Sequence, residues 1–498
     1  MSSYEKSGLF NMDADTIKMY MQLLPKLPLV ARVALLHVLQ MSPPSKYVDL
    51  RTEVTVAVLR SFLTPSKPTS ISATQMLLNK DPGIKGRIWV AKYTAPSSKE
   101  TSMRDVVIRA VENMRQPSSN GSPPPPLKAI EWPEAVPVEA EWQGYRAGAT
   151  AQSRLPPITE AEKYTEMMKE VKSPGTVLYF HGGAYFLMDP ATHRPGTKRL
   201  AKMTGGRCYS VRYRLAPQHP FPSALIDALQ SYLTLLYPPL GAFHEAVKPG
   251  HVIFSGDSAG GNLCMALAQL LLEFKRTNTK IQWFGQEVTP HLPGGLALSS
   301  PWMDLTHSSP SCKGNAAFDY LPKLQGLDKT ERPSCAAWPT NPPRKMLYCA
   351  DAFITHPLAT LVMAKSWEGC PPVYMSCGWE LLADEDKYVA VKLHSDKVAV
   401  VFEEYEAMPH CFPMVFMDMP VSARCFGAWT GFIRDVVEHG PASVQTSFRA
   451  VKAKTLKEVD IDPAKLSPYT EAELRERLSN LGRDRTPAKA AGDVAAKL

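Results

Sequence analysis

The clearest pattern along the chain is a series of short apolar runs separated by stretches with helical spacing. The apolar runs lie at residues 175–180, 207–213, 251–255, 294–300, 372–378 and 398–405. Between them, apolar side chains recur at helical spacing, most clearly at 224–236 and 261–274. Short buried strands alternating with helices predict an α/β fold, with a mostly parallel central sheet flanked by helices on both faces. We place this α/β domain at residues 131–440.

Three other regions flank the predicted domain. Residues 1–115 are mostly helical in pattern and predict an N-terminal helical region. Residues 116–130 contain four consecutive prolines and predict an irregular surface loop. Residues 441–498 form a polar tail with one short helix, and Thr470 and Glu473 have the spacing of a capping box at its start.

The most apolar early segment is residues 29–41. It is shorter than the roughly 20 residues that a membrane-spanning helix needs. Arg32, His37 and Gln40 fall on one side of a helical wheel, so the segment predicts an amphipathic helix. Three interpretations remain open, namely packing on the protein itself, peripheral contact with a membrane, and cover over an apolar substrate pocket. Residues 53–63 predict a second amphipathic helix.

Composition and charge exclude several classes of protein. The chain has 498 residues and a net charge of +8, without a run or stripe of Lys and Arg, so we expect no nucleic-acid partner. Its nine cysteines form no C-x-x-C pair, which argues against a zinc site and favours free thiols in a reducing compartment. The first residues lack the pattern of a signal peptide. We therefore expect a cytoplasmic protein, with association with the endoplasmic reticulum membrane as an alternative.

The first chemical motif is Gly256-Asp257-Ser258-Ala259-Gly260, which matches G-x-S-x-G. It lies between a predicted strand and a predicted helix, where a sharp turn would expose the Ser258 hydroxyl. Glycines on both sides avoid Cβ clashes in such a turn. A glycine-rich turn with a capping serine would have a similar sequence, so the motif alone leaves both interpretations open.

A second motif, His181-Gly182-Gly183-Ala184, directly follows the run at 175–180. Acyl transfer creates negative charge on a carbonyl oxygen, and backbone N–H groups in a glycine-rich loop can stabilise that charge. We expect Gly182, Gly183 and Ala259 to donate these N–H groups. His181 completes the predicted oxyanion loop by holding it in place.

A serine nucleophile also needs a base and an acid. His410 directly follows the last predicted strand of the α/β domain, where a proton-transferring histidine is expected. After the run at 372–378 stand three candidate acids, of which Glu380 lies closest to the strand and is preferred. Asp384 is the reserve. The order serine, acid, histidine is that of α/β-hydrolases and differs from the chymotrypsin and subtilisin orders.

With these motifs, the chain resembles the hormone-sensitive-lipase family of α/β-hydrolases, which includes steryl acetyl hydrolases and arylacetamide deacetylases. The resemblance covers about residues 170–435 and rests on "YFHGGAYF", "YRLAPQHPFPSALIDAL", "GDSAGGNL", "CPPVYMSCGWELLADED" and "MPHCF". It assigns the nucleophile to Ser258 and the base to His410. It also implies that N-terminal helices form a cap over an apolar pocket.

The sequence departs from the family pattern at three positions. Ala184 stands in place of a third glycine, Gln218 in place of a common glutamate, and Glu380 in place of the usual aspartate. Glutamate is one methylene longer than aspartate, but it can still reach His410 Nδ1 if the loop relaxes.

The resulting prediction is a serine ester hydrolase that needs no metal and no cofactor. The family resemblance implies a small, apolar ester substrate, such as the acetyl ester of a sterol or a secondary metabolite. An acyltransferase or amidase with the same triad is one alternative, because a fold does not fix the substrate. A receptor for a small ligand on the same fold is another, and the presence of His410 argues against it.

Overall fold

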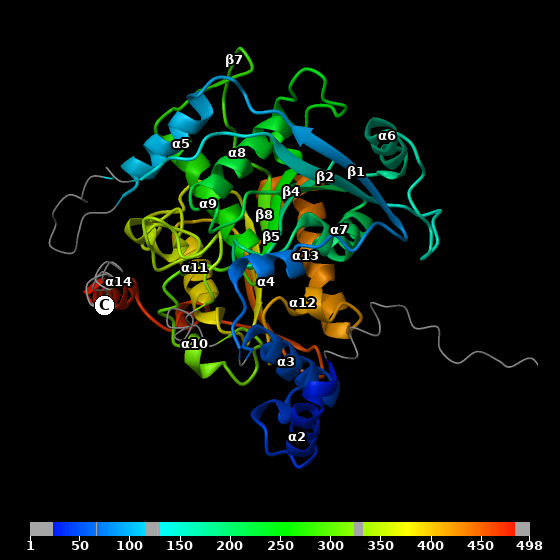
Figure 1. The fold of residues 1–498 in the computed structure, drawn as a ribbon, viewed down its shortest axis with the longest axis vertical. Helices are drawn as coiled ribbons and strands as arrows, with labels where there is room; N and C mark the ends of the chain where they lie inside the picture. Colours follow the sequence, from blue (N-terminus) through cyan, green and yellow to red (C-terminus); the bar gives the residue numbers. More distant parts are fainter. Residues whose placement is uncertain (1–22, 66, 116–126, 128–129, 323–331, 484–498) are drawn as a thin grey trace, which may run out of the picture.

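A ten-stranded sheet forms the centre of the molecule in this computed structural model (Figure 1). The structure describes residues 23–65, 67–115, 127, 130–322 and 332–483. The strand order is β1-β2-β4-β3-β5-β8-β9-β10-β11-β12. The sheet strands are β1 (Ile88–Ala95), β2 (Val138–Tyr145), β3 (Thr176–Phe180), β4 (Arg207–Arg212), β5 (Val252–Asp257), β8 (Gly295–Ser299), β9 (Val373–Gly378), β10 (Val400–Tyr405), β11 (Ser447–Val451) and β12 (Glu458–Asp460). From β4 to β11 all neighbours pair in parallel, and β1, β2 and β12 are antiparallel additions at the two edges.

Helices cover both faces of this sheet or lie beside it. They are α2 (Leu27–Val38), α3 (Leu50–Leu63), α4 (Ile71–Leu78), α5 (Ser102–Asn113), α6 (Glu160–Glu170), α7 (Pro190–Thr204), α8 (Ser223–Leu236), α9 (Ala259–Arg276), α10 (Ser311–Gly314), α11 (Ala383–Ser395), α12 (Phe412–Val415), α13 (Pro420–His439) and α14 (Glu471–Arg483). A separate hairpin pairs β6 (Ile281–Trp283) with β7 (Gln286–Val288). Figure 1 shows α8 and α9 on one side of the sheet and α7 and α13 on the other.

Strand β3 shows why the central strands are apolar on both sides. Its five residues are all buried. Leu178 and Phe180 pack in the core that includes α8 and α9, whereas Val177 and Tyr179 pack in the core that includes α7 and α13. Alternate side chains of a strand point to opposite faces, so a strand covered on both faces has no polar side.

The six predicted strands and the two predicted helices are confirmed, with shifts of a few residues at their ends. The predicted outer regions differ from the structure. Residues 1–115 contain β1 and α5, which belong to the central sheet and its covering layer, and residues 441–498 contain β11 and β12. Edge strands such as these are stabilised by pairing with distant strands, which local apolar patterns do not reveal. Most of the proline-rich stretch 116–130 lies outside the described residues.

Thr470 and Glu473 form the predicted capping box, because the Glu473 N–H donates to Thr470 Oγ1 and the Thr470 N–H donates to Glu473 Oε2.

All nine cysteines are free, and only Cys335 among them is not buried. No helix in the described part of the chain is long and apolar enough to cross a bilayer.

The N-terminal helices α2 and α3 form a hairpin beside the sheet, and α4 follows. On α2, His37 faces α3, where its Nδ1 lies 2.5 Å from Glu53 Oε2, while Arg32 and Gln40 are exposed. The three polar residues predicted on one side of this helix therefore do not share one environment, and the outward face of α2 is largely apolar. On α4, the Gln75 amide donates to the carbonyl of Phe186 beside the oxyanion loop.

A buried ion pair ties the segment before β1 to the sheet. Arg194 of α7 is 5% exposed, and its guanidinium lies 2.5 Å from Glu141 of β2 and 2.6 Å from Asp81. Glu141 is 2% exposed, so its charge depends on this partner. Asp81 follows α4, so the same arginine anchors the segment after the N-terminal helices to α7 and the central sheet.

Replacing Arg194 by methionine is expected to destabilise the fold by about 3–5 kcal/mol, because it leaves the Glu141 charge buried without its partner. The matched control is Arg475→Met, which removes the exposed i,i+4 pair with Glu471 and is expected to cost about 1 kcal/mol or less. Thermal and urea unfolding followed by circular dichroism measure both variants. Equal unfolding midpoints for the two would contradict the structural role of Arg194.

Candidate active site

Ser258 stands at a sharp turn between β5 and α9. Its backbone has φ 52° and ψ −121°, a strained conformation that turns the side chain away from the strand. The turn is tight, because a Cβ on Gly256 or Gly260 would overlap the Phe180 carbonyl oxygen at the end of β3. Only glycine fits at these two positions, as the motif predicted. Ser258 is half-buried, and the N-terminus of α9 lies directly behind it.

Glu380 and His410 form a buried acid–base pair. Glu380 is fully buried, His410 is 3% exposed, and His410 Nδ1 lies 2.9 Å from Glu380 Oε1. The carboxylate therefore accepts the Nδ1 proton, which leaves Nε2 to act as the base. Among the described residues the Ser258 hydroxyl has no hydrogen bond to His410, and such contacts often tighten only when a substrate binds.

The surroundings of His410 favour its protonated form. Burial by itself lowers the pKa of His410, but the charges of Glu380 and Asp319 outweigh it, so the pKa lies above its usual value. A base with a raised pKa takes the serine proton more readily. The same charges stabilise the imidazolium that forms during the reaction.

The structure brings Glu380, and not Asp384, into contact with His410. Asp384 Oδ2 accepts a hydrogen bond from the Ser311 N–H, 2.8 Å away, and so contacts α10 instead of the histidine. Glu380 Oε2 accepts from the Ser300 hydroxyl at 2.6 Å and from the Gly378 N–H at 3.1 Å. These two donors fix the longer glutamate side chain so that its other oxygen reaches His410.

Asp319 is a buried carboxylate that the sequence analysis did not find. Its Oδ1 accepts from the His410 N–H at 3.2 Å, and its Oδ2 accepts from the Leu381 N–H at 2.8 Å. It thus joins the backbone beside the acid to the backbone of the base. Arg60 of α3 donates to the Asp319 carbonyl, which connects this loop to the N-terminal helices. No local motif marks Asp319, because its partners lie 62 and 91 residues away.

The oxyanion loop differs from the prediction at Gly182. The Gly182 N–H donates to Asp257 Oδ1 at 3.1 Å, so the assignment of this group to the oxyanion is wrong. The N–H groups of Gly183, Ala184 and Ala259 have no hydrogen-bond partner among the described residues. Gly183 and Ala184 have φ values of 108° and 51°, so the loop turns sharply where these amides lie. We infer that Ala184 takes the place predicted for Gly182.

His181 holds the oxyanion loop as predicted. Its ring Nδ1 lies 2.7 Å from the Gly182 carbonyl, and its own carbonyl accepts from the Tyr213 hydroxyl at 2.6 Å. Burial, together with the charge of His193, lowers the pKa of His181 to about 3. The ring is therefore neutral at physiological pH, and its role is structural.

Asp257, next to the nucleophile, anchors the same loop. Its carboxylate accepts from Gly182 and from the Tyr179 hydroxyl at 2.7 Å, and it lies 3.3 Å from His193 Nε2. Burial raises the pKa of Asp257, but His193 and Tyr179 more than reverse this and bring it to about 2. Burial likewise lowers the pKa of His193, but Asp257 raises it above the usual value. The pair therefore favours a carboxylate facing an imidazolium.

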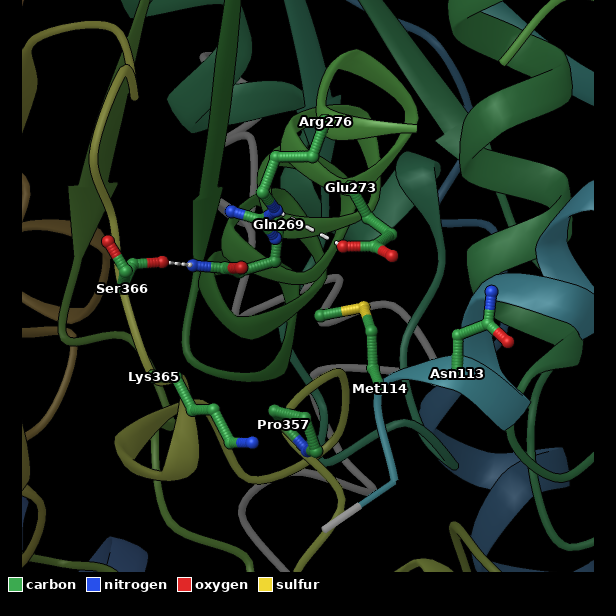
Figure 2. A pocket seen from close by; sticks show the side chains of 8 residues that line it. All are labelled: Asn113, Met114, Gln269, Glu273, Arg276, Pro357, Lys365 and Ser366. Atoms are coloured by element: carbon green, nitrogen blue, oxygen red, sulfur yellow. Dashed lines mark hydrogen bonds and ion pairs between the residues drawn. The ribbon is translucent and has the colours of Figure 1, made fainter. Parts of the chain in front are cut away.

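Other features lie away from this site. A cavity of about 320 Å³ opens at the far end of α9, where Gln269, Glu273 and Arg276 line it together with Lys365 (Figure 2). Gln269 is three helical turns from Ser258, so this cavity is separate from the nucleophile. No group of three or more His, Cys, Asp or Glu side chains in the described segments is arranged to hold a metal ion.

The fold and the site together define a serine hydrolase of the α/β-hydrolase class. Residues 177–414 match the model of a family described as having the alpha/beta hydrolase fold. An esterase of Acinetobacter venetianus is 28% identical over 250 residues, which are 50% of this chain and 71% of that protein. The hormone-sensitive lipase of Homo sapiens is 34% identical over 99 residues, 20% of this chain and 9% of that protein. The chain therefore contains a domain of this family with the alpha/beta hydrolase fold, is similar to esterases and to hormone-sensitive lipase, and is a carboxylic ester hydrolase.

Solved structures show the same fold. The crystal structure of EstE5 soaked with p-nitrophenyl butyrate aligns with a TM-score of 0.51 at 22% identity, covering 76% of this chain and 96% of that chain. A mutant of the esterase E40 aligns with a TM-score of 0.51 at 20% identity, covering 78% and 100%. At these identities the similarity shows the fold alone.

In the mechanism that we infer for this site, His410 Nε2 removes the Ser258 proton as the hydroxyl oxygen attacks the ester carbonyl. The N–H groups of Gly183, Ala184 and Ala259 stabilise the oxyanion. His410 then protonates the leaving alcohol, and an acyl-enzyme remains. Water, activated by His410, releases the acid.

The identity of the acid can be tested by a pH–rate profile. The base must be neutral, so kcat/KM falls as the pH drops through the pKa of His410. Glu380→Gln removes the charge that raises this pKa, so the acidic limb is expected to move to lower pH. The plateau of kcat/KM is expected to fall by about 10³- to 10⁴-fold, because the amide no longer orients and stabilises the imidazolium.

Asp384→Asn is the matched control for this experiment, since it removes a carboxylate from the same segment without touching His410. Its acidic limb and plateau are expected to stay close to those of the parent. A collapse of activity in Asp384→Asn, with Glu380→Gln unaffected, would reverse the assignment of the acid.

Proposed function

We propose that this ester hydrolase removes a small, acetyl-like acyl group from an apolar alcohol such as a sterol or a secondary metabolite. One relative supports the small acyl group by its name: an acetyl-hydrolase of Streptomyces hygroscopicus is 27% identical over 286 residues, 57% of this chain and 83% of that protein. The observation that carries the proposal in this chain is a wall of large aromatic side chains beside Ser258.

The aromatic wall begins next to the oxyanion loop. Tyr185 directly follows Ala184, is fully buried, and stacks on Tyr348 with ring centroids 3.6 Å apart. The Tyr185 hydroxyl donates to Asn262, one turn into α9. Trp302 lies 6.4 Å from Tyr185, centroid to centroid, and its backbone N–H donates to the Ser258 carbonyl. Close-packed rings at this position leave little volume for a long acyl chain.

Helix α4, which contacts the loop after the oxyanion residues, carries exposed apolar side chains. Gln75 fixes α4 over the loop after the oxyanion residues through the Phe186 and Ala216 carbonyls and through Gln218. The neighbouring Met76 and Leu77 are 80% and 66% exposed. An apolar surface on this helix suits the alcohol part of an apolar ester better than a polar surface would.

A panel of esters tests this proposal. For p-nitrophenyl esters, we expect kcat/KM for acetyl to exceed that for decanoyl by about tenfold or more, because a close-packed wall rejects added methylenes. Sterol acetates are expected to be hydrolysed, with the free sterol and acetate measured as products. Ser258→Ala is expected to abolish turnover of every ester, and a preference for decanoyl or oleoyl esters would refute the small-acyl proposal.

The same panel separates the alternative functions. Transfer of the acyl group to an added alcohol in preference to water would indicate an acyltransferase, and faster cleavage of an aryl acetamide than of the matching ester would indicate an amidase. Tight binding of an apolar ligand without any turnover would indicate a receptor. The buried Glu380–His410 pair supports turnover, because a receptor does not need a polarised base.

A further inference from the structure

The helix α2 turns an apolar face to the solvent. Along this face, exposed apolar residues lie about one or two helical turns apart from the short turn Leu24–Lys26 onward. They are Leu24, Leu27, Leu35, Val38, Leu39 and Met41, each at least 56% exposed. No residue of α2 is buried in the described structure. A surface helix normally turns polar residues outward, so this face is unusual for a protein surface.

The face lies in an outer layer of the molecule. Val56 of α3 is buried in a core with Met408 and Phe412, which flank His410. Helix α2 packs on the other side of α3, antiparallel to it, since His37 contacts Glu53 and Lys26 contacts Ser61. Figure 1 shows α2 at the end of the molecule, outside α3. The outward residues of α2 therefore do not cover the catalytic residues, and their exposure needs another explanation.

Basic residues lie near this apolar face. Between residues 23 and 80 the chain has seven Lys and Arg residues, of which Arg60 turns inward to Asp319, and only two acidic ones. Both acidic residues are engaged, because Asp49 caps α3 and Glu53 accepts from Ser42 and contacts His37. Arg32 on α2 and Arg51 on α3 are exposed, and the Lys26 ammonium lies over the ring of the exposed Phe62.

We propose that the outward face of α2, with the adjoining Phe62 and Leu63 of α3, docks on the surface of a lipid bilayer that contains anionic lipids. The exposed leucines and valine insert at the level of the headgroups, and the surrounding arginines and lysines contact the lipid phosphates. An apolar face bordered by basic residues is the composition that binds such a surface. Resting on the proposed function, docking would hold the enzyme at the surface of the phase in which apolar esters concentrate.

A second copy of the chain is a less favourable partner. In a two-fold dimer the same patch meets itself, so Arg32 and Arg51 of one copy would face the basic residues of the other. Like charges brought together at an interface oppose association. Anionic lipid satisfies both the apolar side chains and the surrounding positive charge.

Vesicle binding tests the proposal without depending on the proposed substrate. Full-length protein carrying Ser258→Ala is mixed with phosphatidylcholine vesicles, with or without phosphatidylserine, and the bound fraction is measured by flotation. We expect binding that increases with phosphatidylserine. In the same background, the double change Leu35→Glu and Val38→Glu is expected to weaken binding by about tenfold or more. Arg32→Glu and Arg51→Glu are each expected to weaken binding to anionic vesicles by about fivefold.

Matched controls use similar side chains elsewhere. Leu240→Glu changes an exposed leucine elsewhere, and Lys465→Glu changes an exposed basic residue elsewhere, and both variants are expected to bind vesicles like the parent. With Ser258 intact, the α2 variants are expected to hydrolyse a soluble p-nitrophenyl ester at the parental rate, which shows that they fold.

Three results would overturn the proposal. They are parental vesicle binding by the Leu35/Val38 variant, equal binding of the parent to neutral and anionic vesicles, and loss of binding in the control variants. Self-association through this face is tested by size-exclusion chromatography with light scattering. If the parent is a dimer and the α2 variants are monomers, while vesicle binding is unchanged, the face would be assigned to self-association instead.

Discussion

The buried carboxylate of Asp257 is the constraint on which the arrangement of this site depends. It ends β5 one residue before the nucleophile, and it accepts hydrogen bonds from the Gly182 amide and the Tyr179 hydroxyl. These hydrogen bonds fix the distance between the end of β5, which carries the nucleophile, and the end of β3, which carries the oxyanion loop. Burial makes the free carboxylate costly, and the contact with His193 offsets that cost. The Gly182 amide is thus part of the scaffold, and the next amides along the loop are left for the substrate.

Asp319, a second buried carboxylate, holds the segments of the acid and the base in place in the same way. Asp319 connects the amides of Leu381 and His410, while the Ser300 hydroxyl donates to Glu380 and accepts from the Cys411 amide. Three separate segments therefore meet through side chains whose own positions are fixed. Such support is what keeps catalytic groups within the narrow range of geometry that the reaction needs.

Sequence reasoning found the parts of this structure that depend on local pattern. The strand and helix around Ser258, the position of His410 after β10 and the position of Glu380 after β9 follow from apolar runs and motif order. The parts it missed depend on contacts between distant segments. Strand β1 needs β2 as its partner, Asp319 is defined by amides far along the chain, and the commitment of the Gly182 amide to Asp257 is visible only when both loops are in place.

The glutamate in place of the usual aspartate shows how this scaffold absorbs a change at the centre of the site. An additional methylene moves the carboxylate outward, and an unsupported side chain of that length would lose the orientation of the base. Here Gly378 and Ser300 both donate to Glu380 Oε2, so the carboxylate is fixed at one oxygen and meets His410 with the other. The Ser300 hydroxyl also accepts from the Cys411 N–H. The hydrogen bonds that support the longer acid therefore extend to the loop that carries His410. The longer acid and the serine that supports it therefore act as one unit, and neither is readily changed without the other.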